Sequence, residues 1–103
     1  MYIGEVEISS RRLKLMATLY ILKGINNNTY YIGSTKNFVR RLLEHKSGRS
    51  KYTKNILPVK VVFRQEYRLF ATSRKVEAWI KRQKSKLFIE KIIEQGKILK
   101  SFD

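Results

Sequence analysis

The chain has 103 residues, which suffices for one compact domain but not for two independent hydrophobic cores. Lysine and arginine number 23 against 8 aspartates and glutamates, and the resulting net charge of +15 is spread along the chain. This charge predicts a polyanionic partner, with nucleic acid first and an anionic membrane surface second. The absence of cysteine excludes disulfides, thiol nucleophiles and cysteine-ligated zinc, and leaves oxygen ligands for any metal.

Residues 1–15 alternate loosely between apolar and polar side chains and then turn basic. We interpret them as an appendage: an edge strand, a flexible arm or an extension upstream of the natural start. The apolar run around Met16 to Leu22 is far shorter than the ~20 residues of a membrane span, and no small-residue cleavage site follows it. We therefore expect no membrane partner and a cytoplasmic location, with one domain over residues 16–96 and a tail over 97–103.

Two segments rich in β-branched and aromatic residues, separated by turn-forming residues, predict a β-hairpin. The strands are expected at residues 17–22 and 29–33. A symmetric loop would set Leu22 opposite Thr29 and Tyr20 opposite Tyr31. This register places both tyrosines on one face of the sheet.

Apolar residues at helical spacing then predict a helix that starts at a cap on Thr35 or Asn37 and runs to Gly48. One stripe of this helix is expected to hold Phe38, Arg41, Leu42 and His45. A basic loop containing Tyr52 follows, and Pro58 opens a third strand of sequence VKVVFRQEY.

Two more helices are predicted toward the C-terminus. Thr72 or Ser73 is expected to cap the first, whose inner face would include Trp79, and the last helix should end near Gly96. The order β-β-α-β-α-α predicts an α+β fold, in which helices flank a small three-stranded sheet of antiparallel or mixed strands.

Several short motifs occur in a characteristic order: Leu19-Tyr20-Ile21-Leu22, Tyr31-Ile32-Gly33-Ser34-Thr35, Arg41 with His45, and Glu77 followed by Ile80-Lys81. This set resembles the GIY-YIG nuclease superfamily, above all its short stand-alone members related to the nuclease module of bacterial nucleotide-excision repair. The resemblance extends from about Ala17 to about Ile93. It implies a divalent-metal-dependent endonuclease that hydrolyses DNA, selective for DNA structure in repair or recombination, with RNA not excluded as a partner and no small-molecule cofactor.

The resemblance also implies roles for individual residues. One or both motif tyrosines, Tyr20 and Tyr31, would help to deprotonate the attacking water, and Arg41 would stabilise charge on the scissile phosphate. The alternative is a metal-bound hydroxide that a tyrosine only positions. From its place on the helix stripe, His45 is expected to orient a tyrosine. Glu77 would hold Mg²⁺ or Mn²⁺ together with water and substrate phosphate, because a single carboxylate cannot hold the ion alone. Nucleic-acid contacts are expected from Gly33, Ser34, Thr35, Arg40, Lys51, Lys54 and Lys81.

Each of these residues also has a plain structural interpretation. Tyr31 fits a core aromatic, Arg41 a side chain whose methylenes cover apolar surface, and His45 a structural hydrogen-bonding group. Glu77 fits an i to i+4 ion pair with Lys81. The first motif keeps only its tyrosine. The competing hypothesis is therefore a catalytically weak or inactive nucleic-acid-binding module with the same fold.

Overall fold

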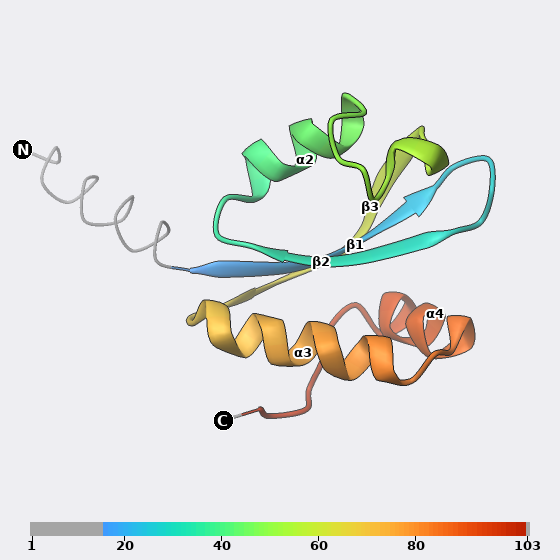
Figure 1. The fold of residues 1–103 in the computed structure, drawn as a ribbon. Helices are drawn as coiled ribbons and strands as arrows, with labels where there is room; N and C mark the ends of the chain where they lie inside the picture. The colour runs from blue at the N-terminus through green and yellow to red at the C-terminus, as the bar shows by residue number, and fades with distance from the viewer. Residues whose placement is uncertain (1–15, 103) are drawn as a thin grey trace, which may run out of the picture.

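The computed structural model describes residues 16–102, in which a three-stranded sheet lies between two layers of helix (Figure 1). The elements follow in the order β1 (Ala17–Gly24), β2 (Tyr30–Thr35), α2 (Phe38–Lys46), the short 3-10 helix η1 (Lys54–Ile56), β3 (Val59–Tyr67), α3 (Phe70–Arg82) and α4 (Lys86–Gln95). Both strand pairings in this part of the chain are antiparallel. The predicted α+β fold and element order are confirmed, and the predicted appendage lies outside the described residues.

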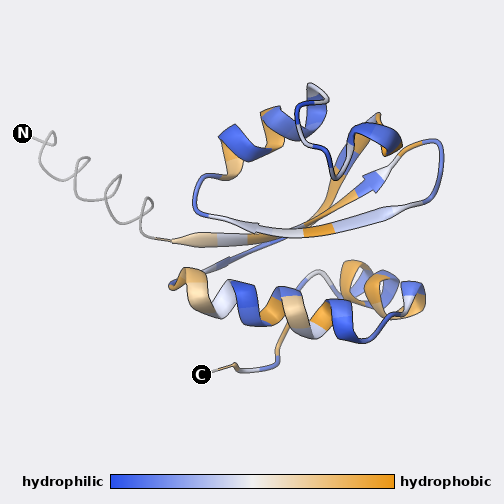
Figure 2. Cartoon of the chain, viewed as in Figure 1, coloured by the Kyte–Doolittle hydropathy of each residue, from blue (hydrophilic) through white to orange (hydrophobic). Residues whose placement is uncertain are grey.

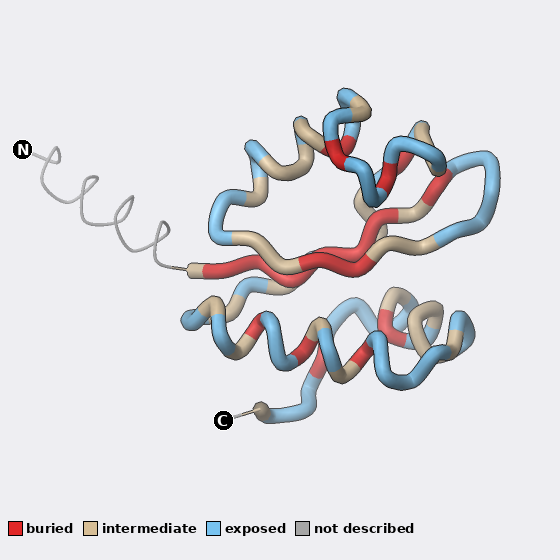
Figure 3. The backbone as a smooth tube through the Cα atoms, in the orientation of Figure 1, coloured by how far each residue is buried: buried red, intermediate tan, exposed pale blue. Residues whose placement is uncertain are grey.

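The central strand β1 separates two hydrophobic clusters. The strands are arranged β2-β1-β3, so β2 is an edge strand. Because side chains alternate along a strand, Leu19 and Ile21 pack against α3 and α4, whereas Tyr20 and Leu22 pack on the face covered by α2. Buried residues are concentrated along the strands (Figure 3), and each of the three helices carries both hydrophobic and hydrophilic residues (Figure 2). The site described below lies on the α2 face.

The hairpin register differs from the prediction by two residues. Leu22 pairs with Tyr31 instead of Thr29, and Tyr20 pairs with Gly33. The cause is that β1 continues to Gly24, where it still pairs with β3, so that the turn falls later than a symmetric loop would place it. A shift of two residues preserves the alternation of faces. Tyr20 and Tyr31 therefore still share one face.

The predicted helix ends are confirmed for α2 and α4 but wrong at the start of α3. Asn37 caps α2, with its side chain accepting from the backbone of Arg40, and α4 ends at Gly96 with φ of 79°. Helix α3 already begins at Phe70, with only two residues between it and the end of β3, and has no side-chain cap. Ser73 instead lies inside the first turn and donates to the Phe70 carbonyl oxygen at 2.7 Å.

The residues after α4 return to the sheet and to α3. The Gln65 side chain of β3 accepts from the Ile98 backbone N–H at 2.8 Å and donates to its carbonyl oxygen at 3.1 Å. Trp79 packs edge-on against Phe88 and Phe102, which agrees with its expected place on the inner face of α3. Over residues 16–102, none of the helices combines the length and the apolar character that crossing a membrane requires.

Candidate active site

The sheet face under α2 carries four side chains in mutual contact, which we call the tyrosine cluster: Tyr20, Tyr31, Arg41 and His45. Tyr20 comes from β1 and is only 1% exposed, whereas Tyr31 comes from the edge strand β2 and is partly exposed. Their ring centroids lie 6.2 Å apart, and the centroid of His45 lies 4.9 Å from that of Tyr31. Strands β1 and β2 and helix α2 thus bring together the two motif tyrosines and the two polar residues of the predicted helix stripe.

Gly33 provides the space that the Tyr20 ring occupies. The two residues face each other across β1 and β2. A Cβ atom added at Gly33 would lie 2.6 Å from the Tyr20 hydroxyl oxygen and 2.7 Å from Cζ. A larger residue would therefore displace the tyrosine ring. In this structure Gly33 leaves room for the Tyr20 ring. This role differs from the nucleic-acid contact that the sequence analysis expected of Gly33.

Two buried hydrogen bonds run through His45. One joins the Tyr20 hydroxyl oxygen and His45 Nε2 at 2.8 Å, and the other joins His45 Nδ1 and Thr53 Oγ1 at 2.8 Å. In the tautomer protonated at Nδ1, Tyr20 donates to His45 and His45 donates to Thr53; in the other tautomer both bonds run the opposite way. In either case the Tyr20 hydroxyl is engaged inside the protein.

Burial dominates the protonation of both partners. It lowers the pKa of His45 to about 4, with a further lowering from the charge of Arg41, so this histidine is neutral near pH 7. Burial followed by repulsion from Tyr31 raises the pKa of Tyr20, although Arg41 opposes the rise. Tyr20 is therefore a neutral phenol at physiological pH, suited to holding a partner in place.

The lowered pKa of His45 should make stability fall as the pH drops from about 6.5 to about 4. In this range the unfolded chain takes up a proton on its histidine and the folded chain does not. The free energy of unfolding should fall by up to about 1.4 kcal/mol per pH unit. Urea unfolding of the wild type and of His45→Gln, which keeps hydrogen-bonding groups but does not titrate, measures the difference. Equal pH slopes for the two proteins would contradict this assignment.

Arg41 connects the tyrosines to an acidic neighbour. Its Nη1 donates to Glu44 Oε1 at 2.9 Å, and the arginine side chain is 29% exposed. This bond raises the pKa of Arg41 more than burial lowers it, and interactions with Tyr31 and Tyr20 add to the rise. The guanidinium group is therefore a fixed positive charge beside both phenols and within reach of solvent. Arg40, its neighbour, is exposed.

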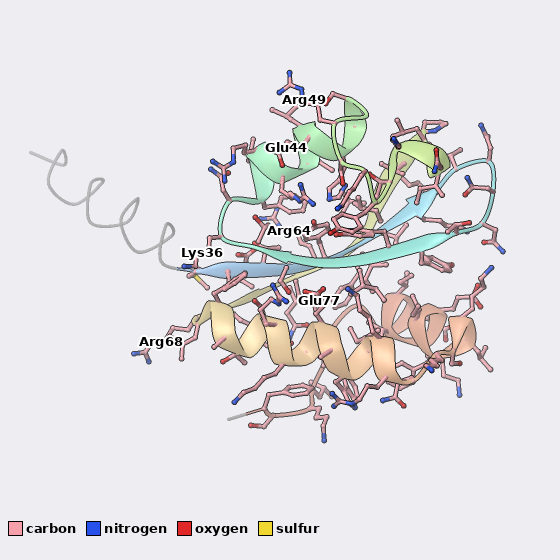
Figure 4. The ribbon with its side chains drawn as sticks, in the orientation of Figure 1. Lys36, Glu44, Arg49, Arg64, Arg68 and Glu77 are labelled. Carbon is pink, nitrogen blue, oxygen red and sulfur yellow. The ribbon has the colours of Figure 1, made fainter. Side chains whose placement is uncertain are left out.

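Glu77 lies on α3, on the other side of the sheet from the tyrosine cluster (Figure 4). Its oxygens approach Lys81 Nζ at 2.6 Å and Arg74 Nε at 3.7 Å, and its side chain is 13% exposed. The plain ion-pair interpretation is thus present in the structure, on a carboxylate that is largely covered. Ser73, one turn earlier, accepts a hydrogen bond from Ser34 of β2 at 3.1 Å, which sets this part of α3 against the edge strand.

The donor set at Glu77 fits only a weakly held metal ion. Residues 16–102 contain no group of three or more histidine, aspartate or glutamate side chains that could hold one. A single carboxylate suits Mg²⁺ or Mn²⁺ when water and substrate phosphate supply the other ligands. An incoming ion would compete with Arg74 and Lys81 for the carboxylate oxygens.

The other residues expected to contact nucleic acid occupy several elements. The Ser34 hydroxyl is used in the bond to α3, and Thr35 Oγ1 accepts from the Asn37 backbone at 3.0 Å before α2. Lys51 and Lys54 are exposed on the loop after α2, and Lys81 is exposed on α3. The structure therefore distributes these side chains over both faces of the sheet.

The site contains three residues to which the sequence analysis gave no role. Thr53 is buried and holds His45, and the Tyr52 ring stacks on Tyr31 with centroids 6.1 Å apart. Arg64 of β3 is paired with Tyr20 and lies over the Phe38 ring, 4.2 Å from its centroid (Figure 4). The sequence offered no signal for Arg64 beyond a charged residue in a predicted strand.

Comparison with known proteins agrees with this geometry. A family model described as the GIY-YIG catalytic domain matches residues 16–92. The chain therefore belongs to this nuclease family, whose members generally use divalent metals. The predicted family is confirmed.

Similar proteins occur in Streptococcus and Listeria species. A UPF0213 protein of Streptococcus pneumoniae is 39% identical over 69 residues, covering 66% of this chain and 69% of the relative. A UPF0213 protein of Listeria welshimeri is 42% identical over 64 residues, covering 61% of this chain and 70% of the relative. No solved structure matches the chain.

Proposed function

We propose that the protein is a divalent-metal-dependent endonuclease that hydrolyses DNA phosphodiester bonds. The observation that carries the proposal is the tyrosine cluster, in which a partly exposed phenol, a buried phenol and an arginine meet on one sheet face of a strongly basic chain. A neutral ligand would gain no electrostatic attraction from this positive charge. A phosphodiester has both the negative charge that Arg41 stabilises and a phosphorus atom that water can attack.

In the proposed mechanism, Tyr31 accepts the proton of the attacking water. Tyr20 is buried and its hydroxyl is bound to His45, so it positions the neighbouring ring and does not meet the water. Arg41 interacts with both phenols and stabilises the charge that develops on the scissile phosphate. The new bond joins the water oxygen to phosphorus. The bond from phosphorus to the 3′ oxygen breaks, and that oxygen keeps the electron pair and takes a proton from solvent, so the products are a 5′-phosphate and a 3′-hydroxyl.

Glu77 is the carboxylate that we propose for the metal. A bound Mg²⁺ or Mn²⁺ would neutralise charge on the scissile phosphate. Support comes from the position of α3, which contacts the same edge strand that carries Tyr31. A DNA strand lying along the β2 edge could therefore meet Tyr31 on one sheet face and Glu77 on the other.

A second candidate is a nucleic-acid-binding module without useful catalysis, and one observation favours it. Both Glu77 oxygens already face cations, Arg74 and Lys81, so a metal must displace an existing interaction. Such a module would bind nucleic acid in a salt-dependent manner and cleave no substrate.

Cleavage assays distinguish the two candidates. Purified protein should nick supercoiled plasmid with Mn²⁺ or Mg²⁺ and not in excess EDTA, and a panel of linear, nicked, flap and four-way DNA, with RNA counterparts, gives the preferred structure. Glu77→Ala, purified in parallel, controls for contaminating nuclease. No cleavage of any substrate by well-folded wild-type protein would refute the nuclease and leave the binding module.

A further inference from the structure

The loop between α2 and η1 is firmly anchored, yet it exposes a large aromatic side chain. Ser50 and Thr53 are buried, and the Thr53 hydroxyl is bonded to His45. Between them the backbone N–H of Tyr52 donates to Ser50 Oγ at 3.3 Å. Tyr52 itself is 61% exposed. Anchors on both sides thus hold this ring at the surface in a defined place.

Tyr52 is also aligned with the tyrosine cluster. Its ring lies at 26° to that of Tyr31, with centroids 6.1 Å apart, in a stacked arrangement. One side of the ring is thus supported by a second aromatic ring, while the residue keeps most of its surface in contact with solvent. Single exposed aromatics are ordinary on protein surfaces. Tyr52 differs from such residues because it stacks on Tyr31, the residue assigned above to the attacking water.

The segment of chain around Tyr52 is basic. Residues 45–65 contain no acidic side chain and six lysines and arginines: Lys46, Arg49, Lys51, Lys54, Lys60 and Arg64. Lys51 Nζ lies over the Tyr52 ring, 5.3 Å from its centroid, on a flexible side chain that can move aside for a base. Within residues 16–102, neither Lys51 nor Lys54 forms an ion pair. These ammonium groups are available to phosphates on either side of a nucleotide that reaches Tyr52.

An exposed aromatic ring beside free cations matches the chemistry of an unstacked nucleotide. In a duplex both faces of each base are already covered by neighbouring bases, so a protein ring can stack only on a base that has left the helix. We infer that Tyr52 is a stacking platform for an unpaired base next to the cleaved phosphate, so that the substrate class is single-stranded or locally unpaired nucleic acid. This inference rests on the proposed nuclease function and narrows its substrate.

Binding in EDTA tests the inference without requiring cleavage. Base stacking on an aromatic ring contributes about 1–3 kcal/mol, which corresponds to roughly 5- to 150-fold in affinity. Fluorescence anisotropy should show this loss for Tyr52→Ala and Tyr52→Leu on labelled oligo-dT. Affinity for a blunt-ended two-strand DNA stem without a loop should change less than about twofold. Tyr52→Phe and Tyr52→Trp should retain wild-type affinity for oligo-dT. A single 2-aminopurine placed in oligo-dT should be quenched by the proteins with an aromatic ring and not by the alanine or leucine variants.

Leu43→Ala is the matched control, because Leu43 is exposed on α2 and has no role in the site. It should leave both affinities unchanged, and circular dichroism should show that every variant is folded. Equal losses on oligo-dT and on the stem, or no loss on either, would overturn the stacking role and leave the nuclease proposal standing. Wild-type protein that binds neither probe would overturn the proposed function as well.

Discussion

Replacing Tyr31 with phenylalanine should lower the rate of DNA cleavage by about a hundredfold or more, while DNA binding in EDTA stays close to wild type. The change removes the hydroxyl group that we assign to proton transfer, and general base catalysis typically contributes 10²- to 10⁴-fold. The ring and its stacking on Tyr52 are retained, so the shape of the site is preserved. Single-turnover plasmid cleavage and fluorescence anisotropy measure the two quantities.

Two tyrosine variants make this result specific. Tyr30→Phe alters the adjacent residue of β2, which packs against the other hydrophobic cluster, and should leave cleavage unchanged. Tyr20→Phe should cost about 1 kcal/mol of stability, because it removes a buried hydrogen bond to His45, and it should slow cleavage less than Tyr31→Phe. Equal rate losses for Tyr20→Phe and Tyr31→Phe would contradict the choice of Tyr31 as the proton acceptor.

The placement of the two tyrosines shows what the sequence can and cannot reveal about this site. Alternation along the strands depends on local residue pattern alone, and it correctly placed Tyr20 and Tyr31 on one face. The register depends on where the turn begins, and that point is set by β3, which holds β1 extended as far as Gly24. No sequence pattern within the hairpin reports this distant pairing.

The same difference between local pattern and tertiary contact explains why Thr53 and Arg64 had no predicted role. The stripe that carries Arg41 and His45 follows from helical spacing, and the helix observed there has that spacing. The partner of His45 is Thr53, which reaches it only because the following loop folds back under α2. The tertiary approach of β3 likewise brings Arg64 opposite Tyr20. Composition predicted a basic loop but not which of its residues would be buried.

Helix α3 shows how tertiary contacts override a local preference. A threonine and a serine near its start predicted a capped N-terminus, but the helix begins three residues before Ser73. Ser73 is instead completely buried, and its carbonyl oxygen accepts a bond from Ser34. Its hydroxyl is satisfied within the first turn. This contact with the edge strand also sets the position of Glu77 one turn later.

Replacing Glu77 with glutamine should lower metal-dependent cleavage by about a hundredfold or more, and should leave binding in EDTA unchanged or stronger. A metal ion contributes several kcal/mol to stabilising charge in such reactions, and each 1.4 kcal/mol is tenfold in rate. Loss of the carboxylate charge also frees Lys81 and Arg74 to attract phosphate. Cleavage should be measured across a Mn²⁺ titration, and affinity by anisotropy.

Lys81→Ala separates a metal site from a structural ion pair. If Glu77 served only to hold Lys81, then removing either partner would have the same small effect, because such surface pairs contribute about 0–1 kcal/mol. If Glu77 holds the metal, Lys81→Ala should cleave nearly as well as wild type while Glu77→Gln does not. Glu94→Gln, which changes an exposed carboxylate on α4, controls for the loss of one negative charge.

Helix α3 lies across the sheet from Tyr31. A large effect of Glu77→Gln would therefore also require the scissile strand to pass along the β2 edge, where it can meet both side chains.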